Sequence, residues 1–185
     1  MPRSRVIILN GVGSVGKSST ANAVQAIAHE PLMNVAMDTF LSMLPGKLFG
    51  TPDGLVFEKV QDDSGPCIAI RTGPVIERTL RGMRHAIAAL ADQGNDLIVD
   101  EVMLGSGEAA EYRRLLSDHD LKFVGLFAPL EVIEARERAR GDRAIGLARG
   151  LYGRVHIGVT YDLEIETSAT TPEENARRIC EAFGL

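Results

Sequence analysis

The sequence is poor in cysteine, in tryptophan and in basic charge, and these shortages exclude several classes of protein. Its two cysteines, Cys67 and Cys180, stand alone and have neither the spacing of a zinc site nor that of a disulfide framework. The formal net charge of −5 argues against a nucleic-acid partner, because phosphate backbones attract basic surfaces. We therefore expect a small-molecule partner. The oligomeric state stays open, a homo-oligomer included.

Long hydrophobic runs are also missing. No apolar stretch reaches the roughly 18 residues that a membrane-spanning helix needs. The apolar run that follows residues 1–5 is too short for the hydrophobic region of a signal peptide. The simplest expectation is a cytoplasmic protein that contacts no membrane. Its 185 residues, 45% of them hydrophobic, predict a single domain, residues 1–185, with a full hydrophobic core.

The most informative stretch is residues 6–18, which read VIILNGVGSVGKS. Its first half predicts a buried strand, and its second half has the spacing GxxxxGKS of a P-loop, followed by a helical pattern through Ala28. Glycines let successive backbone N–H groups surround a phosphate at a helix N-terminus, where the helix dipole favours an anion. We therefore predict a nucleoside triphosphate site, against the simpler alternative of a glycine turn that caps a helix.

Each part of this motif has an expected role. Lys17 should bridge the β- and γ-phosphates, and Ser18 should bind Mg²⁺. The residues predicted to contact the nucleotide in this motif are Gly11, Val12, Gly13, Ser14, Val15, Gly16, Lys17, Ser18 and Ser19.

An aspartate follows the next apolar segment. Residues 34–40 predict a short buried strand with Asp38 at its carboxyl end, the edge at which open parallel sheets bind ligands. An aspartate close to the γ-phosphate can take the proton from an attacking hydroxyl or help to place the metal. Asp38 also suits the N-cap of a helix that starts near Thr39, and the two roles are compatible.

Residues 97–102, LIVDEV, have the form of a Walker B segment, an apolar strand that ends in carboxylates. Asp100 is expected to hold the Mg²⁺ shell beside Ser18, and Glu101 to lean towards the acceptor. The alternative is a pair of strand-end carboxylates in solvent, which the upstream P-loop makes less favourable.

An insertion from about 45 to 72 interrupts the alternation of strands and helices. Two short apolar runs around the turn 62–65 predict a hairpin. Long insertions often form binding loops or lids, so Phe57 is expected to contact the acceptor. A hairpin that only covers the edge of the sheet would have the same pattern.

The longest predicted helix spans 73–93. Its apolar face includes Met83, a second candidate acceptor contact, and its other face carries Arg78, Arg81 and Arg84. Such a run of charge is usually a solvated face.

A helix that begins at Pro129 is predicted to carry Arg136, Arg140 and Arg143 on one face, because they recur at i, i+4 and i+7. Guanidinium groups clamp phosphate oxygens and stack on adenine. The segment from about 136 to 155, with a second helix over 144–154, therefore predicts a mobile lid. The alternative is an exposed arginine face paired with glutamates of the same helix.

The last strand is predicted over 163–167, and the final helix begins after Thr171, a favourable N-cap residue. The loop 167–170 is expected to contact adenine through Thr167 and Ser168. Together these elements predict an α/β protein with a three-layer αβα P-loop NTPase fold, a five-stranded parallel sheet and a helical lid.

Taken in order, these motifs resemble the chloramphenicol phosphotransferase family over nearly the whole chain. The P-loop occurs in many kinases, whereas RxxxRGDR at 136–143 and HxGVxYD at 156–162 are more specific to this group. The resemblance implies a P-loop kinase that uses ATP and Mg²⁺ to phosphorylate a primary hydroxyl of an antibiotic. It implies Asp38 as the base, Lys17 as the phosphate clamp, Ser18 as a Mg²⁺ ligand, and Arg136, Arg140 and Arg143 as the lid, with Arg136 and Arg140 acting in catalysis.

The acceptor region departs from the family pattern. The insertion is longer, and the arginine series on the helix 73–93 replaces a more apolar face, which would suit an acidic acceptor if it lined the pocket. The acceptor is therefore either similar to chloramphenicol or another metabolite alcohol, as in shikimate or gluconate kinases. Two further alternatives are a nucleotide-dependent switch, although the guanine-reading Asn-Lys-x-Asp segment is missing from the sequence, and a kinase for nucleic-acid ends or a nucleotide sugar. His156 and Asp162 have no predicted role.

Overall fold

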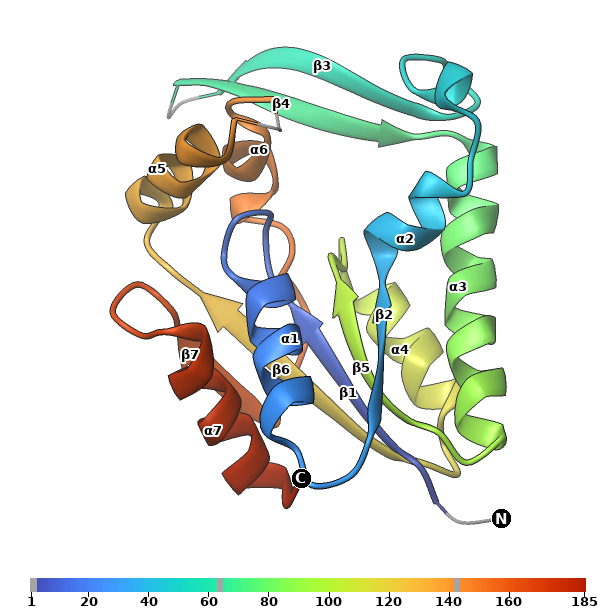
Figure 1. Ribbon diagram of the computed structural model, residues 1–185. Coiled ribbons are helices and arrows are strands. Elements are labelled where there is room, and N and C mark those ends of the chain that lie inside the picture. The colour runs from blue at the N-terminus through green and yellow to red at the C-terminus, as the bar shows by residue number, and fades with distance from the viewer. Residues whose placement is uncertain (1–2, 63–64, 142–143) are drawn as a thin grey trace.

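The computed structural model describes residues 3–62, 65–141 and 144–185. Within these residues, five parallel strands form one sheet in the order β2-β5-β1-β6-β7 (Figure 1). The strands are β1 (Arg5–Asn10), β2 (Leu32–Ala36), β5 (Asp96–Glu101), β6 (Asp120–Phe127) and β7 (Leu163–Glu166). This order places β1, which leads into the phosphate-binding motif, at the centre of the sheet.

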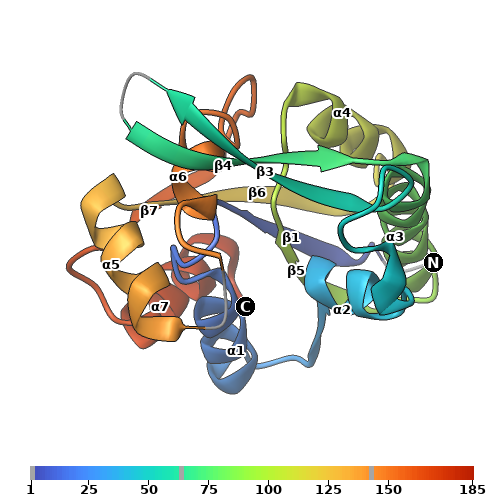
Figure 2. The same cartoon turned by 90° about the horizontal axis from the view of Figure 1, so that it is seen from above.

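Helices cover both faces of the sheet (Figures 1 and 2). They are α1 (Lys17–Ile27) and α7 (Pro172–Phe183) on one face, and α3 (Pro74–Asp92) and α4 (Ser106–Leu115) on the other. Alternate residues of a strand point to opposite faces, so Ile7 and Leu9 belong to the core beneath α1, and Val6 and Ile8 to the core beneath α3. Residues 6–9 of β1 thus supply both cores, which is why all four are apolar.

A further group of elements lies over the carboxyl ends of the strands (Figure 1). It consists of α2 (Met37–Ser42), a short 3-10 helix (Gly46–Leu48), β3 (Leu55–Asp62), β4 (Gly65–Thr72), α5 (Leu130–Arg140) and α6 (Leu147–Tyr152). β3 and β4 form the antiparallel hairpin predicted from the sequence, although residues 63 and 64 of its turn lie outside the described residues. Figure 2 shows the hairpin spanning from α6 to the start of α3.

The hairpin is anchored to α6. The Ile68 N–H donates to the Gly146 carbonyl at 3.0 Å. Gly150 lies so close to β4 that a Cβ there would be 1.9 Å from the Ile68 carbonyl oxygen. Only glycine fits at this position, so the hairpin and α6 form one continuous roof over this edge of the sheet.

Two predicted elements have different bounds in the structure. The strand predicted over 34–40 ends at Ala36, and α2 begins at once with Met37. Ala36 therefore occupies the N-cap position and Asp38 lies in the first turn of α2, so the predicted capping role of Asp38 is wrong. A carboxylate in a first turn still interacts favourably with the helix dipole. The helix predicted over 144–154 is also shorter in the structure, where α6 spans Leu147–Tyr152.

The strand β2 is buried only in part, because it lies at the edge of the sheet. Leu32 and Val35 are buried, while Met33 and Asn34 are exposed. Of the described helices, none combines the length and apolar character that crossing a bilayer requires.

Candidate functional site

The phosphate-binding motif lies between β1 and α1, at the carboxyl edge of the sheet. Ser14 (φ 65°) and Gly16 (φ 109°) adopt left-handed backbone conformations, which turn the loop onto the N-terminus of α1. At the other end, Gly11 packs against β6, where a Cβ would lie 2.7 Å from the Leu126 carbonyl oxygen. The loop therefore needs glycine at both ends, and it leads into a helix N-terminus, where the dipole favours an anion.

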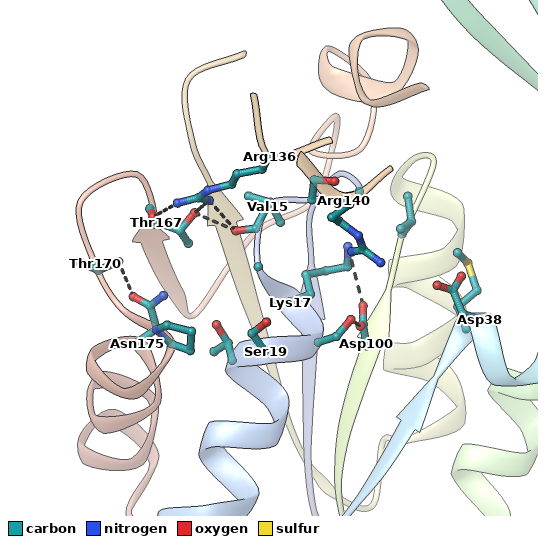
Figure 3. Close-up of a pocket in the computed structure, with 18 residues that line it drawn as sticks. Val15, Lys17, Ser19, Asp38, Asp100, Arg136, Arg140, Thr167, Thr170 and Asn175 are labelled. Atoms are coloured by element: carbon teal, nitrogen blue, oxygen red, sulfur yellow. Dashed lines mark hydrogen bonds and ion pairs between the residues drawn. The ribbon is translucent and has the colours of Figure 1, made fainter. Parts of the chain in front are cut away.

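Lys17 and Ser18 meet Asp100 beside this loop (Figure 3). The strands β1 and β5 are neighbours, with Leu9 opposite Asp100, so the carboxylate lies next to the first turn of α1. Ser18 Oγ donates to Asp100 Oδ2 at 2.5 Å, and Lys17 Nζ lies 3.7 Å from Asp100 Oδ1. Lys17 also donates to the carbonyl oxygens of Gly11 and Val12, at 2.8 and 3.0 Å. A buried cation is thus held at the centre of the loop.

The hydroxyl of Ser18 and the carboxylate of Asp100 fit a Mg²⁺ site. Both are hard oxygen donors, and Mg²⁺ in proteins usually has one or two carboxylate ligands and completes its shell with waters and phosphate oxygens. The described part of the chain holds no cluster of three or more His, Cys, Asp or Glu side chains that could bind a metal.

A cavity of about 350 Å³, here called the phosphate cavity, surrounds the loop. Its lining residues are Gly13, Ser14, Val15, Gly16, Lys17, Ser18, Ser19, Thr20, Met37, Asp38, Asp100, Val102, Arg136, Arg140, Thr167, Thr170, Pro172 and Asn175. Ser14 Oγ and Thr20 Oγ1 are buried and have no hydrogen-bond partner among the described residues. Buried hydroxyls are usually paired, so an oxygen-rich ligand in this cavity would supply the missing acceptors.

One side of the phosphate cavity is formed by contacts between α5 and the loop after β7 (Figure 3). Arg136 donates from Nη2 to the Thr167 carbonyl at 2.7 Å and from Nη1 to Thr167 Oγ1 at 3.1 Å. Thr167 Oγ1 in turn donates to the Val15 carbonyl at 2.8 Å. Nearby, Thr170 Oγ1 donates to Asn175 Oδ1 at 2.7 Å. Figure 3 shows Asp38 on the opposite side of the loop from Thr170 and Asn175.

A second cavity, of about 500 Å³ and here called the apolar cavity, lies under the roof formed by the hairpin and α6. Its lining residues are Gly13, Met37, Asp38, Leu41, Ser42, Phe49, Leu55, Phe57, Ile70, Thr72, Ile76, Leu80, Val102, Leu104, Glu137, Ala144, Leu147 and Leu151. None of these described residues is basic. Gly13, Met37, Asp38 and Val102 line both cavities, and Asp38 carries the only ionisable side chain among those four.

Comparison with known proteins decides the family. Residues 4–184 match the family model described as "Chloramphenicol phosphotransferase-like protein". The chain belongs to this family. A protein of two strains of Mycobacterium tuberculosis named "Putative O-phosphotransferase" is 30% identical over 188 residues, which cover 99% of this chain and 84% of the relative. The chain is thus a phosphotransferase with a nucleotide-binding P-loop, as the sequence motifs predicted.

Solved structures confirm the predicted three-layer αβα kinase fold. The APS kinase CysC of Mycobacterium tuberculosis, in complex with AMPPNP and APS, is 18% identical, with a TM-score of 0.68 and 100% of both chains covered. A gluconokinase from Sinorhizobium meliloti is 14% identical, with a TM-score of 0.61 and 98% of this chain and 92% of the other covered. At these identities the likeness concerns the fold alone.

Most of the predicted nucleotide contacts of this phosphotransferase gather around the phosphate cavity. They are Gly13, Ser14, Val15, Gly16, Lys17, Ser18, Ser19, Arg136, Arg140 and Thr167, joined by Asp38 and Asp100. Gly11 and Val12 do not line this cavity, and their carbonyl oxygens accept hydrogen bonds from Lys17. Phe57 lines the apolar cavity. Arg143 lies outside the described residues.

Three predicted contacts lie elsewhere. Glu101 points to the face of the sheet opposite Asp100, where it is buried and accepts the Tyr112 hydroxyl at 2.6 Å. Burial raises the pKa of this carboxyl group, and the expected contact with the acceptor is wrong. Met83 is fully buried in the core beneath α3, one turn below the helix residues that reach the apolar cavity. Ser168 is exposed, lines neither cavity, and donates its N–H to Glu166.

The solvated face predicted for the arginine series of α3 is confirmed at Arg78 and Arg81, which are exposed, whereas Arg84 is partly buried. Arg84 pairs with Glu111 of α4 at 2.5 Å, and the arginine series of α3 lines neither cavity. Glu134 pairs with Arg149 at 2.6 Å, while both oxygens of Glu137 accept N–H groups at the start of α6, at 2.8 Å. Glu134 and Glu137 therefore connect α5 to α6, while Arg136 contacts Thr167.

Sequence reasoning missed Thr20, Pro172 and Asn175, which line the phosphate cavity. Thr20 follows the P-loop motif by two residues, and its place in the first turn of the helix after the loop was the available signal. Pro172 and Asn175 lie in the first turn of α7, where Thr171 and Glu174 form a capping box. That capping pattern predicted a helix start, but nothing in it indicated that the first turn would face the P-loop.

His156 provides a pH-dependent term in stability. Burial, followed by the nearby charge of Lys17, lowers the pKa of His156 from 6.5 to about 4. Between these pH values the unfolded chain binds a proton at His156 that the folded chain does not, so the free energy of unfolding should decrease as the pH falls through this window. Denaturant unfolding at pH 7 and pH 5 tests this. The variant His156→Gln, which does not titrate, should lose less stability on acidification than the wild type, and equal losses would contradict the assignment.

Proposed function

We propose that this chain is an ATP- and Mg²⁺-dependent kinase that transfers the γ-phosphate to a hydroxyl group of a small, largely apolar and uncharged molecule, as in the inactivation of an antibiotic such as chloramphenicol. The observation that carries the proposal is the position of Asp38, which lines both the phosphate cavity and the apolar cavity. A carboxylate at that junction lies where a phosphate from one cavity would meet a hydroxyl from the other.

On the nucleotide side, the side chains supply charge and position, which is most of what phosphoryl transfer requires. Lys17 lies at the centre of the loop and would bind the β- and γ-phosphates. Ser18 and Asp100 would hold Mg²⁺, which neutralises charge that develops on the phosphates. Arg140 of α5 faces the same cavity and would bind phosphate oxygens from the lid side.

At the far side of the phosphate cavity, the first turn of α7 and the loop after β7 would receive the nucleoside. Thr170 and Asn175 bond to each other there, and Arg136 is fixed across Thr167. The planar guanidinium of Arg136 is suited to stacking on adenine. Thr170 and Asn175 lie on the opposite side of the loop from Asp38 (Figure 3). This arrangement supports a bound nucleotide whose γ-phosphate points to the apolar cavity.

On the acceptor side, Asp38 would accept the proton that the attacking hydroxyl loses. The remaining lining of the apolar cavity supports an uncharged acceptor, because aliphatic and aromatic side chains dominate it and its other ionisable residue, Glu137, is also acidic. An acceptor with a carboxylate, such as shikimate or gluconate, would meet two acidic residues and no basic one among the described lining residues. The acidic acceptor suggested by the arginine series is therefore disfavoured.

Acceptor-dependent turnover of ATP tests this function. Purified protein with ATP and Mg²⁺ is expected to form ADP at least about tenfold faster with chloramphenicol than with water alone, while shikimate and gluconate add nothing, because the apolar cavity repels their carboxylates. Phe57→Ala should weaken the response to chloramphenicol, whereas Val60→Ala, on the same strand but outside the cavity, should not.

Other outcomes would redirect the assignment. Stimulation by shikimate or gluconate would favour a metabolite kinase and contradict the proposed acceptor class. Slow ADP formation that no acceptor accelerates would instead favour a nucleotide-dependent switch.

A further inference from the structure

The side chain of Asn10 joins three segments that lie far apart in the sequence. Asn10 is fully buried at the end of β1, directly before the phosphate loop. Its Oδ1 accepts the Met103 N–H at 2.9 Å. Its Nδ2 donates at 2.6 Å both to the Val155 carbonyl and to the Tyr161 hydroxyl. Both donors of the amide and its carbonyl oxygen are therefore in use.

Tyr161 extends this contact to His156. The tyrosine oxygen lies 2.7 Å from His156 Nδ1. Asn10 donates to that oxygen, and His156 Nδ1 is the acceptor that the described residues place within reach of the Tyr161 hydroxyl proton, so we assign the hydroxyl as donor and Nδ1 as acceptor. His156 is therefore neutral with its proton on Nε2, in agreement with its lowered pKa of about 4. The three side chains form one directed chain of hydrogen bonds.

Aromatic packing holds the two rings in place. His156 stacks on Phe127 of β6 with ring centroids 4.1 Å apart, and Tyr161 meets Phe127 edge to face at 5.9 Å. Gly125 makes room for this cluster, since a Cβ there would lie 2.7 Å from the Phe127 ring and 2.9 Å from the Tyr161 ring. The backbone of β6 thus admits this arrangement only with glycine at position 125.

The segments joined through Asn10 border both cavities. Asn10 precedes Gly11, whose carbonyl binds Lys17 at 2.8 Å. Met103 is fully buried, and its two neighbours in the sequence line the apolar cavity. Val155 follows α6 by three residues, and α6 forms another wall of that cavity through Leu147 and Leu151. The position of the P-loop relative to these walls therefore depends on the same three hydrogen bonds.

We propose that Asn10, Tyr161 and His156 form a positioning network that sets the apolar cavity at a fixed distance from the phosphate loop. The proposal rests on the proposed transfer of phosphate to an acceptor in that cavity. None of the three side chains lines the phosphate cavity or the apolar cavity, so they act through the segment around Met103. Reacting atoms must approach to about 3–3.5 Å, and a misplacement of about 1 Å can cost about 10²-fold in rate.

The variant Tyr161→Phe removes the central hydroxyl and keeps the ring on Phe127. With chloramphenicol as the probe acceptor, kcat for transfer should fall at least about tenfold relative to the wild type, while KM for ATP should stay within about twofold. The fraction of ADP that arises from hydrolysis of ATP by water should be larger than in the wild type. A role limited to stability would lower Tm and leave this share unchanged. Ser4→Ala is the matched control, because it removes another buried hydrogen bond, 2.8 Å long, to the Ala91 carbonyl at the other end of β1.

A second measurement needs no acceptor. Hydrogen exchange at the Met103 amide reports on its bond to Asn10, and it should be faster in Tyr161→Phe than in the wild type and in Ser4→Ala. Met103 exchange that matches the wild type, or transfer with an unchanged kcat and hydrolysis share, would overturn the network. If the wild type transfers nothing to any acceptor, the proposed function fails, and unchanged exchange would then reject the network separately.

Discussion

Replacing Asp38 with asparagine is expected to reduce kcat for phosphate transfer by about 10²- to 10⁴-fold, the range that general-base catalysis usually contributes. Asparagine keeps the shape of the side chain but cannot accept the proton of the attacking hydroxyl. The side chain lies in the first turn of α2 and lines both cavities, so the fold and the binding of ATP should change little. Steady-state kinetics with ATP, Mg²⁺ and the acceptor, together with thermal unfolding, measure both effects.

Asp118→Asn is the matched control for this variant. It makes the same change of charge at an exposed residue that lines neither the phosphate cavity nor the apolar cavity, and its kcat should equal that of the wild type. Near-normal turnover by Asp38→Asn would remove the assignment of Asp38 as the base. A variant that still binds ATP but turns over at the background rate would support it.

Lys17→Ala should lower kcat/KM for ATP by about 10³-fold or more, because the lost ammonium group would stabilise the charge that builds up on the phosphates. Lys17 is buried with Nζ held by Gly11 and Val12 and close to Asp100. No other lysine lines the phosphate cavity within the described residues. Water that enters the space left by the side chain cannot replace a fixed positive charge.

Two measurements separate the loss of charge from the loss of structure. Circular dichroism and Tm should show a folded Lys17→Ala, and Lys122→Ala, which removes a lysine from the surface of β6, should keep wild-type kinetics. If Lys17→Ala retained kcat/KM for ATP within about threefold of the wild type, the loop would not be the site of phosphate transfer.

The phosphate-binding half of the site could be predicted because its chemistry is local. The left-handed Gly16 and the close approach of Gly11 to β6 explain why the glycines of GxxxxGKS occupy these positions. Asp100 could be placed beside Ser18 because apolar strands of a parallel sheet end at a common edge. The prediction of the hairpin is also confirmed, since two short apolar runs on either side of a turn are close enough in the sequence to pair with each other.

The acceptor half could not be predicted with the same success. Leu80 and Met83 belong to one apolar face of α3, but only the first two turns of that helix extend beyond the sheet to the apolar cavity, and Met83 packs in the core. Glu101 follows Asp100 directly, and the alternation of a strand sends the two carboxylates to opposite faces. The sequence did not reveal which face α1 packs against, and therefore which of the two carboxylates would lie beside the P-loop.

The sequence by itself determined a P-loop, a parallel αβα fold and a family, because each rests on spacings within a few consecutive residues or on their order. Only the tertiary structure decided that Asp38 lines two cavities at once, that the arginines of α3 stay outside both, and that Asn10 meets Tyr161 and His156. A loop binds phosphate with its own consecutive N–H groups. A cavity wall or a buried network is built from side chains that come together only when distant segments pack.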